Sequence, residues 1–211
     1  MRYPFFATFV LFVIWFNVVL AKRNRKDDEQ QRAFWRREHA ANNVRKKPLD
    51  DLPYIAIPVD DLHLDLAGGL SDKKAANEAK RIQSLYDEEA KIVNFTGYSN
   101  TDLKLEYGTA NITKLSEYDA NYTTLVTALH AFGNGLYDEG FYKEAKDVLA
   151  FAVESGTDVS ATYALLTDIY RTKLSLTDEE ISQKLNDMLL KAEDIRSLSK
   201  DRIVRDLKEA L

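Results

Sequence analysis

The hydrophobic pattern of the chain begins with a continuous apolar run. Residues 4–21, with the sequence PFFATFVLFVIWFNVVLA, carry no charged side chain, and only Pro4, Thr8 and Asn17 interrupt the run. At about 1.5 Å per helical residue, the run spans roughly 27 Å, close to the roughly 30 Å hydrocarbon core of a bilayer. We therefore expect residues 1–21 to form a transmembrane anchor helix.

Helical periodicity dominates the chain from Ser71 onward. Apolar residues recur there at spacings of three and four, a pattern typical of amphipathic helices. Capping signals predict the boundaries of five of these helices, over about 73–91, 99–107, 116–139, 177–192 and 199–211. We therefore predict an all-α fold, in which residues 71–211 form a domain of antiparallel helical hairpins.

Two segments of different character lie between the apolar run and this helical domain. Residues 22–47 contain neither Gly nor Pro, which favours a basic juxtamembrane helix (over 27–46) that Pro48 ends. Residues 48–70 contain three of the four prolines, and apolar residues alternate around Ile57. This segment is predicted to be an extended linker, or strap, that docks across the helical domain.

Charge is divided sharply between the segments. The formal net charge of −5 combines +1 from Arg2, +6 in residues 22–47 and −12 in residues 48–211. An acidic body excludes a generic nucleic-acid-binding protein, which would carry its basic residues there. Basic residues that flank a membrane span stay on its cytoplasmic side. In this chain the basic residues directly follow the apolar run. We therefore expect a single-pass protein of the cell membrane, with its N-terminus outside and its body in the cytoplasm.

A second interpretation of the N-terminal segment remains open. Val19-Leu20-Ala21 would suit signal-peptide cleavage, which would make the protein an exported one acting outside the membrane. Against this, the run exceeds the roughly 7–15 apolar residues of a typical signal peptide. The absence of cysteine fits either compartment and removes thiolate chemistry.

The basic segment also carries two adjacent aromatic residues. Phe34 and Trp35 are flanked by arginines, so this helix could lie on anionic lipid, with the aromatic rings at the acyl boundary. A plain solvated continuation of the anchor helix explains the same residues equally well. The candidate membrane-surface residues are Lys22, Arg23, Arg25, Lys26, Phe34 and Trp35.

The region 126–159 carries a spaced series of bulky, small and turn residues: Leu129, Phe132, Gly133, Leu136, Gly140, Tyr142, Ala145, Leu149 and Ala152. This series resembles one tetratricopeptide repeat, and a degenerate second unit extends the resemblance to about residue 195. The resemblance implies a helical scaffold that binds an unidentified protein or peptide through the first helix of each hairpin. The implied partner-binding residues are Thr127, His130, Asn134, Tyr137, Asp168 and Arg171.

Two interpretations of His130 compete. With Asn134 one helical turn away it could hold a peptide backbone or carboxylate, but a half-buried helix residue is the simpler explanation. The segments YIAIP and TGYSNTDLKLEYG also resemble small anchored proteins of unassigned function in Gram-positive anaerobes, which implies no activity. No common catalytic or nucleotide-binding motif occurs, so we expect no enzyme, no cofactor and no metal. The sequence therefore predicts a membrane-tethered scaffold for protein–protein interaction.

Overall fold

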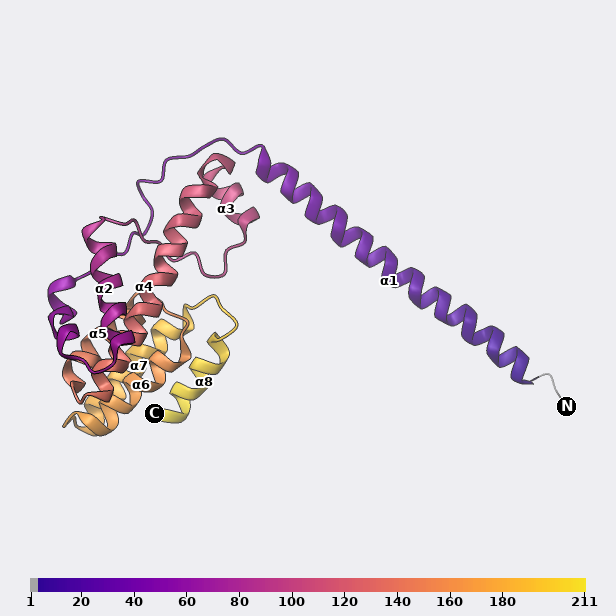
Figure 1. Ribbon diagram of the computed structural model, residues 1–211. Coiled ribbons are helices and arrows are strands. Elements are labelled where there is room, and N and C mark those ends of the chain that lie inside the picture. Colours follow the sequence, from indigo (N-terminus) through magenta and orange to yellow (C-terminus); the bar gives the residue numbers. More distant parts are fainter. Residues whose placement is uncertain (1–3) are drawn as a thin grey trace. The chain divides into compact units, whose positions relative to one another are not determined.

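The computed structural model describes residues 4–211, and the side chains of residues 8–23 and 25–211. Within this described part every regular element is helical, which confirms the all-α class (Figure 1). The elements are α1 (Pro4–Asn42), η1 (Val59–Asp61), η2 (Leu64–Gly69), α2 (Lys73–Asp87), α3 (Asn100–Tyr107), η3 (Thr109–Asn111), α4 (Ile112–Asp138), α5 (Tyr142–Glu154), α6 (Ser160–Asp168), η4 (Ile169–Lys173), α7 (Asp178–Glu193) and α8 (Lys200–Ala210).

The chain folds into two compact units. The first unit combines the residues up to Pro48 with Ser99–Ile112, and the second combines Leu49–Tyr98 with Thr113–Leu211. Each unit is therefore built from segments that are distant in the sequence. The second unit contains the predicted helical hairpins, and the first contains α1 and α3.

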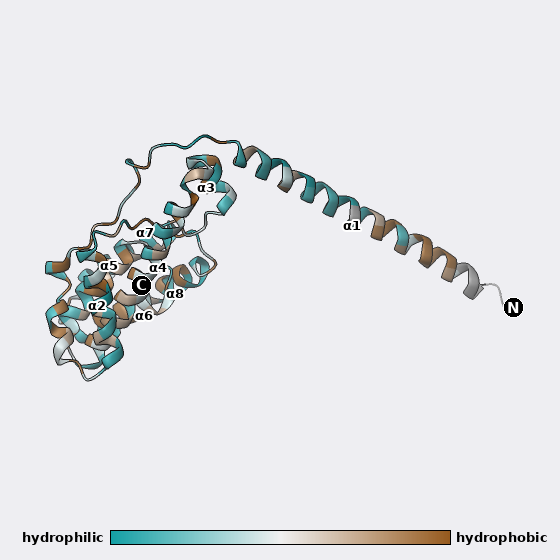
Figure 2. Cartoon of the chain, turned by 45° about the horizontal axis from the view of Figure 1, so that its top comes forward, coloured by the Kyte–Doolittle hydropathy of each residue, from teal (hydrophilic) through white to brown (hydrophobic). Residues whose placement is uncertain are grey.

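In the first unit, one helix, α1, carries both the apolar run and the basic segment, and its hydropathy changes along its length (Figure 2). The helix ends at Asn42, before the predicted end near residue 46. The Asn43 side chain donates a 2.9 Å hydrogen bond to the His39 carbonyl. The Lys47 amide donates a 3.0 Å bond to the Tyr107 carbonyl, which it could not do inside the helix.

The C-terminal end of α1 packs against α3 through polar contacts around one buried small residue. Ala41 is fully buried. Glu38 accepts a 2.8 Å hydrogen bond from the Thr101 hydroxyl and forms an ion pair with Lys104. The predicted start of α3 is confirmed, because Ser99 and Asp102 form a reciprocal capping box. Local capping and these contacts together hold α3 on α1.

Within the first unit, Asn111 fixes the end of α3 to the segment that follows α1. Its side-chain amide donates hydrogen bonds of 2.8 Å to the Lys47 carbonyl and 2.7 Å to the Tyr107 carbonyl. The residue is fully buried. These bonds give a donor to the Lys47 carbonyl and a second donor to the Tyr107 carbonyl, which also accepts from the Lys47 amide.

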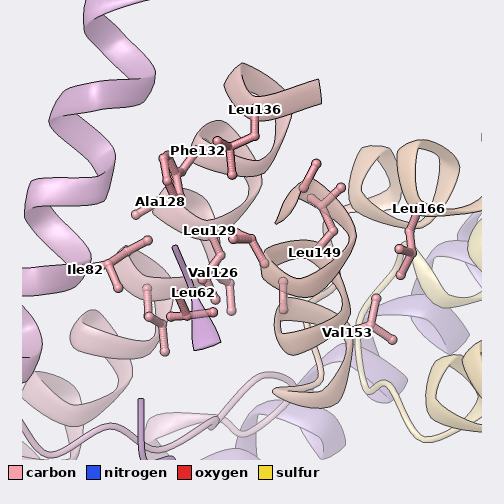
Figure 3. Close-up of a cluster of buried hydrophobic side chains, with 14 of the residues drawn as sticks. Leu62, Ile82, Val126, Ala128, Leu129, Phe132, Leu136, Leu149, Val153 and Leu166 are labelled. Carbon is pink, nitrogen blue, oxygen red and sulfur yellow. The ribbon is translucent and has the colours of Figure 1, made fainter. Parts of the chain in front are cut away.

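In the second unit, α4 and α5 form the hairpin around which the core is built (Figure 3). Leu129, Phe132 and Leu136 on α4 are fully buried, as is Leu149 on α5. Gly133 lets the two helices approach closely, because a Cβ there would lie 2.7 Å from the Leu149 side chain. Gly133 therefore allows the close approach of α4 and α5 that the sequence pattern predicted for this hairpin.

The strap segment of the second unit has no regular structure up to residue 58 and docks on the helices. The Ile55 amide donates a 2.9 Å hydrogen bond to the Ile92 carbonyl, and the Tyr54 and Tyr118 rings meet edge to face at 5.9 Å. Ile57 is part of the buried core. The remainder of the segment forms the short turns η1 and η2, which the sequence pattern did not predict.

The start of α4 differs from the prediction. The helix begins at Ile112 and not near residue 116, because the 3-10 turn η3 leads into it without a break. Ser116 is therefore an exposed position within the helix and no N-cap. Further along, the predicted boundary at Thr177 is confirmed, because Thr177 and Glu180 form a capping box at the start of α7.

Within the described residues, no helix combines the length and the apolar character needed to cross a membrane. Of the predicted anchor, residues 1–3 lie outside the described residues, and the side chains of residues 4–7 are not described either.

Candidate functional site

The candidate site lies on the surface of the second unit, where α4 faces α6. The Tyr137 hydroxyl donates a 2.6 Å hydrogen bond to the carboxylate of Asp168. Both side chains are half-buried. The sequence placed these two residues on one binding face, and the structure brings them into direct contact.

Two further residues, Tyr142 and Lys173, complete this cluster. The Tyr137 and Tyr142 rings meet edge to face at 5.3 Å. The Lys173 ammonium lies 5.5 Å from the centre of the Tyr137 ring and 5.3 Å from that of Tyr142. Aromatic faces attract cations at such distances. We call Tyr137, Tyr142, Asp168 and Lys173 the tyrosine–lysine cluster.

Sequence reasoning missed Lys173 because of an irregular turn. Residues Ile169–Lys173 form the π-helical turn η4, which is wider than an α-helical turn and shifts the residues that follow it. A regular 3.6-residue period does not predict where Lys173 then lies. No sequence signal for this turn was available, whereas the tyrosines stood out by their number.

The charge states within the cluster follow from its hydrogen bonds. The bond to Asp168 raises the pKa of the Tyr137 hydroxyl, which is therefore neutral at physiological pH. Hydrogen bonding with Tyr137 raises the pKa of Lys173, so its amine remains protonated. A protonated amine is no nucleophile, so Lys173 in this state offers a positive charge and hydrogen-bond donors.

His130 and Asn134 do not converge on one ligand position. The His130 Nδ1 atom lies 3.1 Å from the Thr162 hydroxyl on α6, and burial lowers the pKa of the imidazole. Asn134 donates a 2.9 Å hydrogen bond to Asp138 on its own helix. His130 is therefore a half-buried residue that contacts α6, which agrees with the simpler of its two interpretations.

Among the described side chains, the other two predicted partner-binding residues, Thr127 and Arg171, form no hydrogen bond or ring contact with the tyrosine–lysine cluster. Thr127 is exposed on α4, ten residues before Tyr137. Arg171 donates a hydrogen bond to the Ala210 carbonyl at the end of α8. It also lines a cavity of about 420 Å³ together with Ile181 and Leu185 of α7. The structure thus places Arg171 at a second location, between η4, α7 and α8.

The candidate membrane-surface residues belong to the first unit and lie on α1. Lys22, Arg23, Arg25 and Lys26 are all exposed. Phe34 and Trp35 are 55% and 53% exposed, and their rings meet edge to face at 5.5 Å.

Among the residues whose side chains are described, no group of three or more potential metal ligands occurs. Comparison with known proteins gives no match to a family model, a curated protein or a solved structure. The tetratricopeptide-like pattern therefore finds support only at the level of an all-helical architecture.

Proposed function

We propose that the second unit is a scaffold that binds another protein through the surface shared by α4 and α6. The observation that carries this proposal is the hydrogen bond between Tyr137 and Asp168, which joins side chains of α4 and α6 at the surface. Tyr142 and Lys173 add aromatic area and a fixed positive charge to it. Tyrosine is enriched at protein interfaces because its ring and its hydroxyl can both contact a partner.

We further propose that residues 4–21 tether this scaffold to a membrane. The support is the uncharged sequence of that segment and the four basic residues that follow it. The exposed Phe34 and Trp35 would then lie near the headgroups. A tether confines the scaffold to two dimensions and raises its effective concentration for a partner in the same membrane.

The scaffold proposal can be tested by crosslinking in native membranes, followed by identification of the attached protein. The variant Thr127→Arg/Asn134→Arg adds bulk and charge to the α4 surface and should abolish the crosslink. The matched control Asn77→Arg/Tyr86→Arg alters two exposed residues of α2 and should retain it. Equal crosslinking by both variants would remove the α4–α6 surface from consideration.

A triple variant tests the residues taken from the resemblance. His130→Ala/Asn134→Ala/Tyr137→Ala should also lose the partner. His130 contacts α6, so circular dichroism must first show that the helical content of this variant is unchanged. If the folded triple variant still captures the partner, these side chains do not form the binding surface.

The second candidate is an exported protein, and the motif Val19-Leu20-Ala21 favours it. The mass of the chain isolated from its own cells decides between the two. An intact N-terminus supports the tether, and a chain that begins at Lys22 excludes it.

A further inference from the structure

Three asparagines of the chain stand in the Asn-x-Thr sequon that asparagine-linked glycosylation requires. They are Asn94, Asn111 and Asn121. In a secreted protein a sequon marks a surface position, because the attached glycan is bulky and projects into water. The modification also replaces one hydrogen of the side-chain amide, so a glycosylated asparagine keeps one of its two N–H donors. The contacts of each amide therefore show whether the fold can accept a glycan there.

Asn111 cannot carry a glycan in this fold. The residue is fully buried in the first unit, so an attached glycan would have no path to solvent. Its amide uses both N–H donors, one toward the Lys47 carbonyl at 2.8 Å and one toward the Tyr107 carbonyl at 2.7 Å. Glycosylation would remove one of these donors and leave a buried acceptor short of a partner. It would therefore weaken the junction between the end of α3 and the segment that follows α1.

Asn94 is engaged in a similar way in the second unit. Its amide nitrogen lies 2.9 Å from the Tyr122 hydroxyl and 3.2 Å from the Gly156 carbonyl oxygen. The Tyr122 hydroxyl donates to the same carbonyl at 2.8 Å. The amide is also closely packed, since a Cβ added at Gly156 would lie 3.0 Å from the Asn94 Nδ2 atom. A glycan on Asn94 would therefore disrupt the contact between α4 and the turn that follows α5.

Asn121 differs from the other two asparagines. Among the described residues its amide donates one hydrogen bond, of 3.1 Å to the Lys91 carbonyl, and the residue is half-buried on α4. A glycosylated amide would keep the one donor that this bond needs. The Asn121 sequon is therefore compatible with a glycan, and it serves as an internal control for the other two.

We infer that Asn94 and Asn111 are structural anchors that act only without glycans, so that the body folds on the cytoplasmic side of the membrane in any cell that glycosylates its exported proteins. The glycosylating enzyme acts on the chain as it emerges, before burial can protect either asparagine. An exported body would thus be modified at residues whose amides the fold needs. This inference goes beyond the proposed scaffold to its compartment, and it favours the tether over the exported protein.

The test directs the chain into the secretory pathway of a cultured eukaryotic cell. A secretory signal peptide replaces residues 1–21, which yields the mature chain that the exported candidate requires. The shift in gel mobility after enzymatic deglycosylation reports the attached glycans. Secretion and resistance to limited proteolysis report folding. We expect this chain to acquire glycans, to be retained in the cell and to be sensitive to protease.

Variants of the sequon threonines remove chosen sequons and keep every asparagine. Thr96→Ala/Thr113→Ala leaves only the Asn121 sequon, and this chain should be secreted in a protease-resistant form with one glycan. Thr96→Ala/Thr123→Ala leaves only the Asn111 sequon, and this chain should be retained. Thr113 and Thr123 are both exposed, and the change at Thr96 is common to the two variants. The comparison therefore isolates the effect of a glycan at Asn111.

Three results would overturn the inference. They are secretion of a protease-resistant chain with a glycan at Asn111, secretion of a folded chain whose Asn111 sequon is left unmodified, and equal retention of the two double variants. None of them decides the proposed function, because the mass of the isolated chain tests the tether and crosslinking tests the α4–α6 surface. The inference and the proposed function therefore fail in distinguishable ways.

Discussion

Tyr137 and Asp168 are 31 residues apart in the sequence, and a 2.6 Å hydrogen bond joins them across two helices of neighbouring hairpins. The same tyrosine contacts Lys173, which lies on the turn that follows Asp168. Tyr137 thus contacts a carboxylate through its hydroxyl and an ammonium group through its ring.

The first prediction follows from this connection. Tyr137→Phe removes the hydrogen bond that raises the pKa of Lys173, so that pKa should fall toward its ordinary value. NMR titration of labelled lysine side chains measures it directly. Tyr142→Phe removes a hydroxyl from the same cluster and should have the smaller effect, since Tyr142 contacts the Lys173 ammonium through its ring face, which phenylalanine retains. The reverse order of the two effects would contradict this account.

Packing between α4 and α2 provides a second prediction. A Cβ added at Gly135 would lie 2.3 Å from the Cβ of Ala75, a rigid atom that cannot rotate away. Gly135→Ala should therefore lower the free energy of unfolding by about 1–3 kcal/mol, although alanine normally favours a helix. Gly68→Ala, where the added atom would have open space, is the control. Urea denaturation distinguishes the two variants.

His130 should make stability depend on acid pH. Its folded-state pKa lies below its ordinary value because burial disfavours the imidazolium. Its contribution to stability is therefore complete above about pH 6.5 and is lost as the pH falls through the lower folded-state pKa. His130→Gln should reduce the loss of stability between neutral and mildly acidic pH. His39→Gln, on the exposed surface of α1, should not.

Three buried tyrosines predict a loss of stability at alkaline pH. Burial raises the pKa of Tyr122, Tyr163 and Tyr170, the last to about 12. The unfolded chain ionises near pH 10 while the folded chain remains neutral, so each residue should destabilise the fold by up to about 1.4 kcal/mol per pH unit above that point. Tyr170→Phe should reduce this slope without affecting a hydrogen bond. An unchanged slope in urea denaturation would show that Tyr170 ionises freely in the folded state.

The absence of cysteine makes the orientation of the chain directly measurable. Leu198 is fully exposed, so Leu198→Cys introduces a single accessible thiol. In intact cells a membrane-impermeant maleimide should not label it, and after lysis it should. Replacing Lys22, Arg23, Arg25 and Lys26 by glutamine should increase labelling in intact cells, because these charges hold the body on the cytoplasmic side. Full labelling of the unaltered chain in intact cells would place the body outside.

Local signals in the sequence were sufficient for most helix boundaries. The capping boxes at Ser99 and Thr177 specified the starts of α3 and α7, since both partners of each box lie within four residues. Gly140 specified the turn before α5, and its φ of 86° is the left-handed conformation that favours glycine. These features need no knowledge of the tertiary structure.

Boundaries that depend on distant contacts were not predictable in this way. The end of α1 depends in part on a bond from Lys47 to Tyr107, sixty residues later. The tyrosine–lysine cluster depends on the π-helical turn, for which residues 169–173 carry no recognised pattern. Sequence reasoning therefore found Tyr137 and Asp168 but not the position of Lys173 beside them.

The discontinuous first unit determines how the protein can be dissected. The partners of Lys104 and Asn111 are Glu38 and Lys47, which a fragment beginning at Leu49 would lack. Such a fragment would retain α3 without α1, so the side chains of α3 that pack on α1 would be exposed. It would therefore be prone to aggregate even if the second unit folded correctly. A well-behaved excised body would have to replace residues 99–112 by a short linker as well as omit the N-terminal helix.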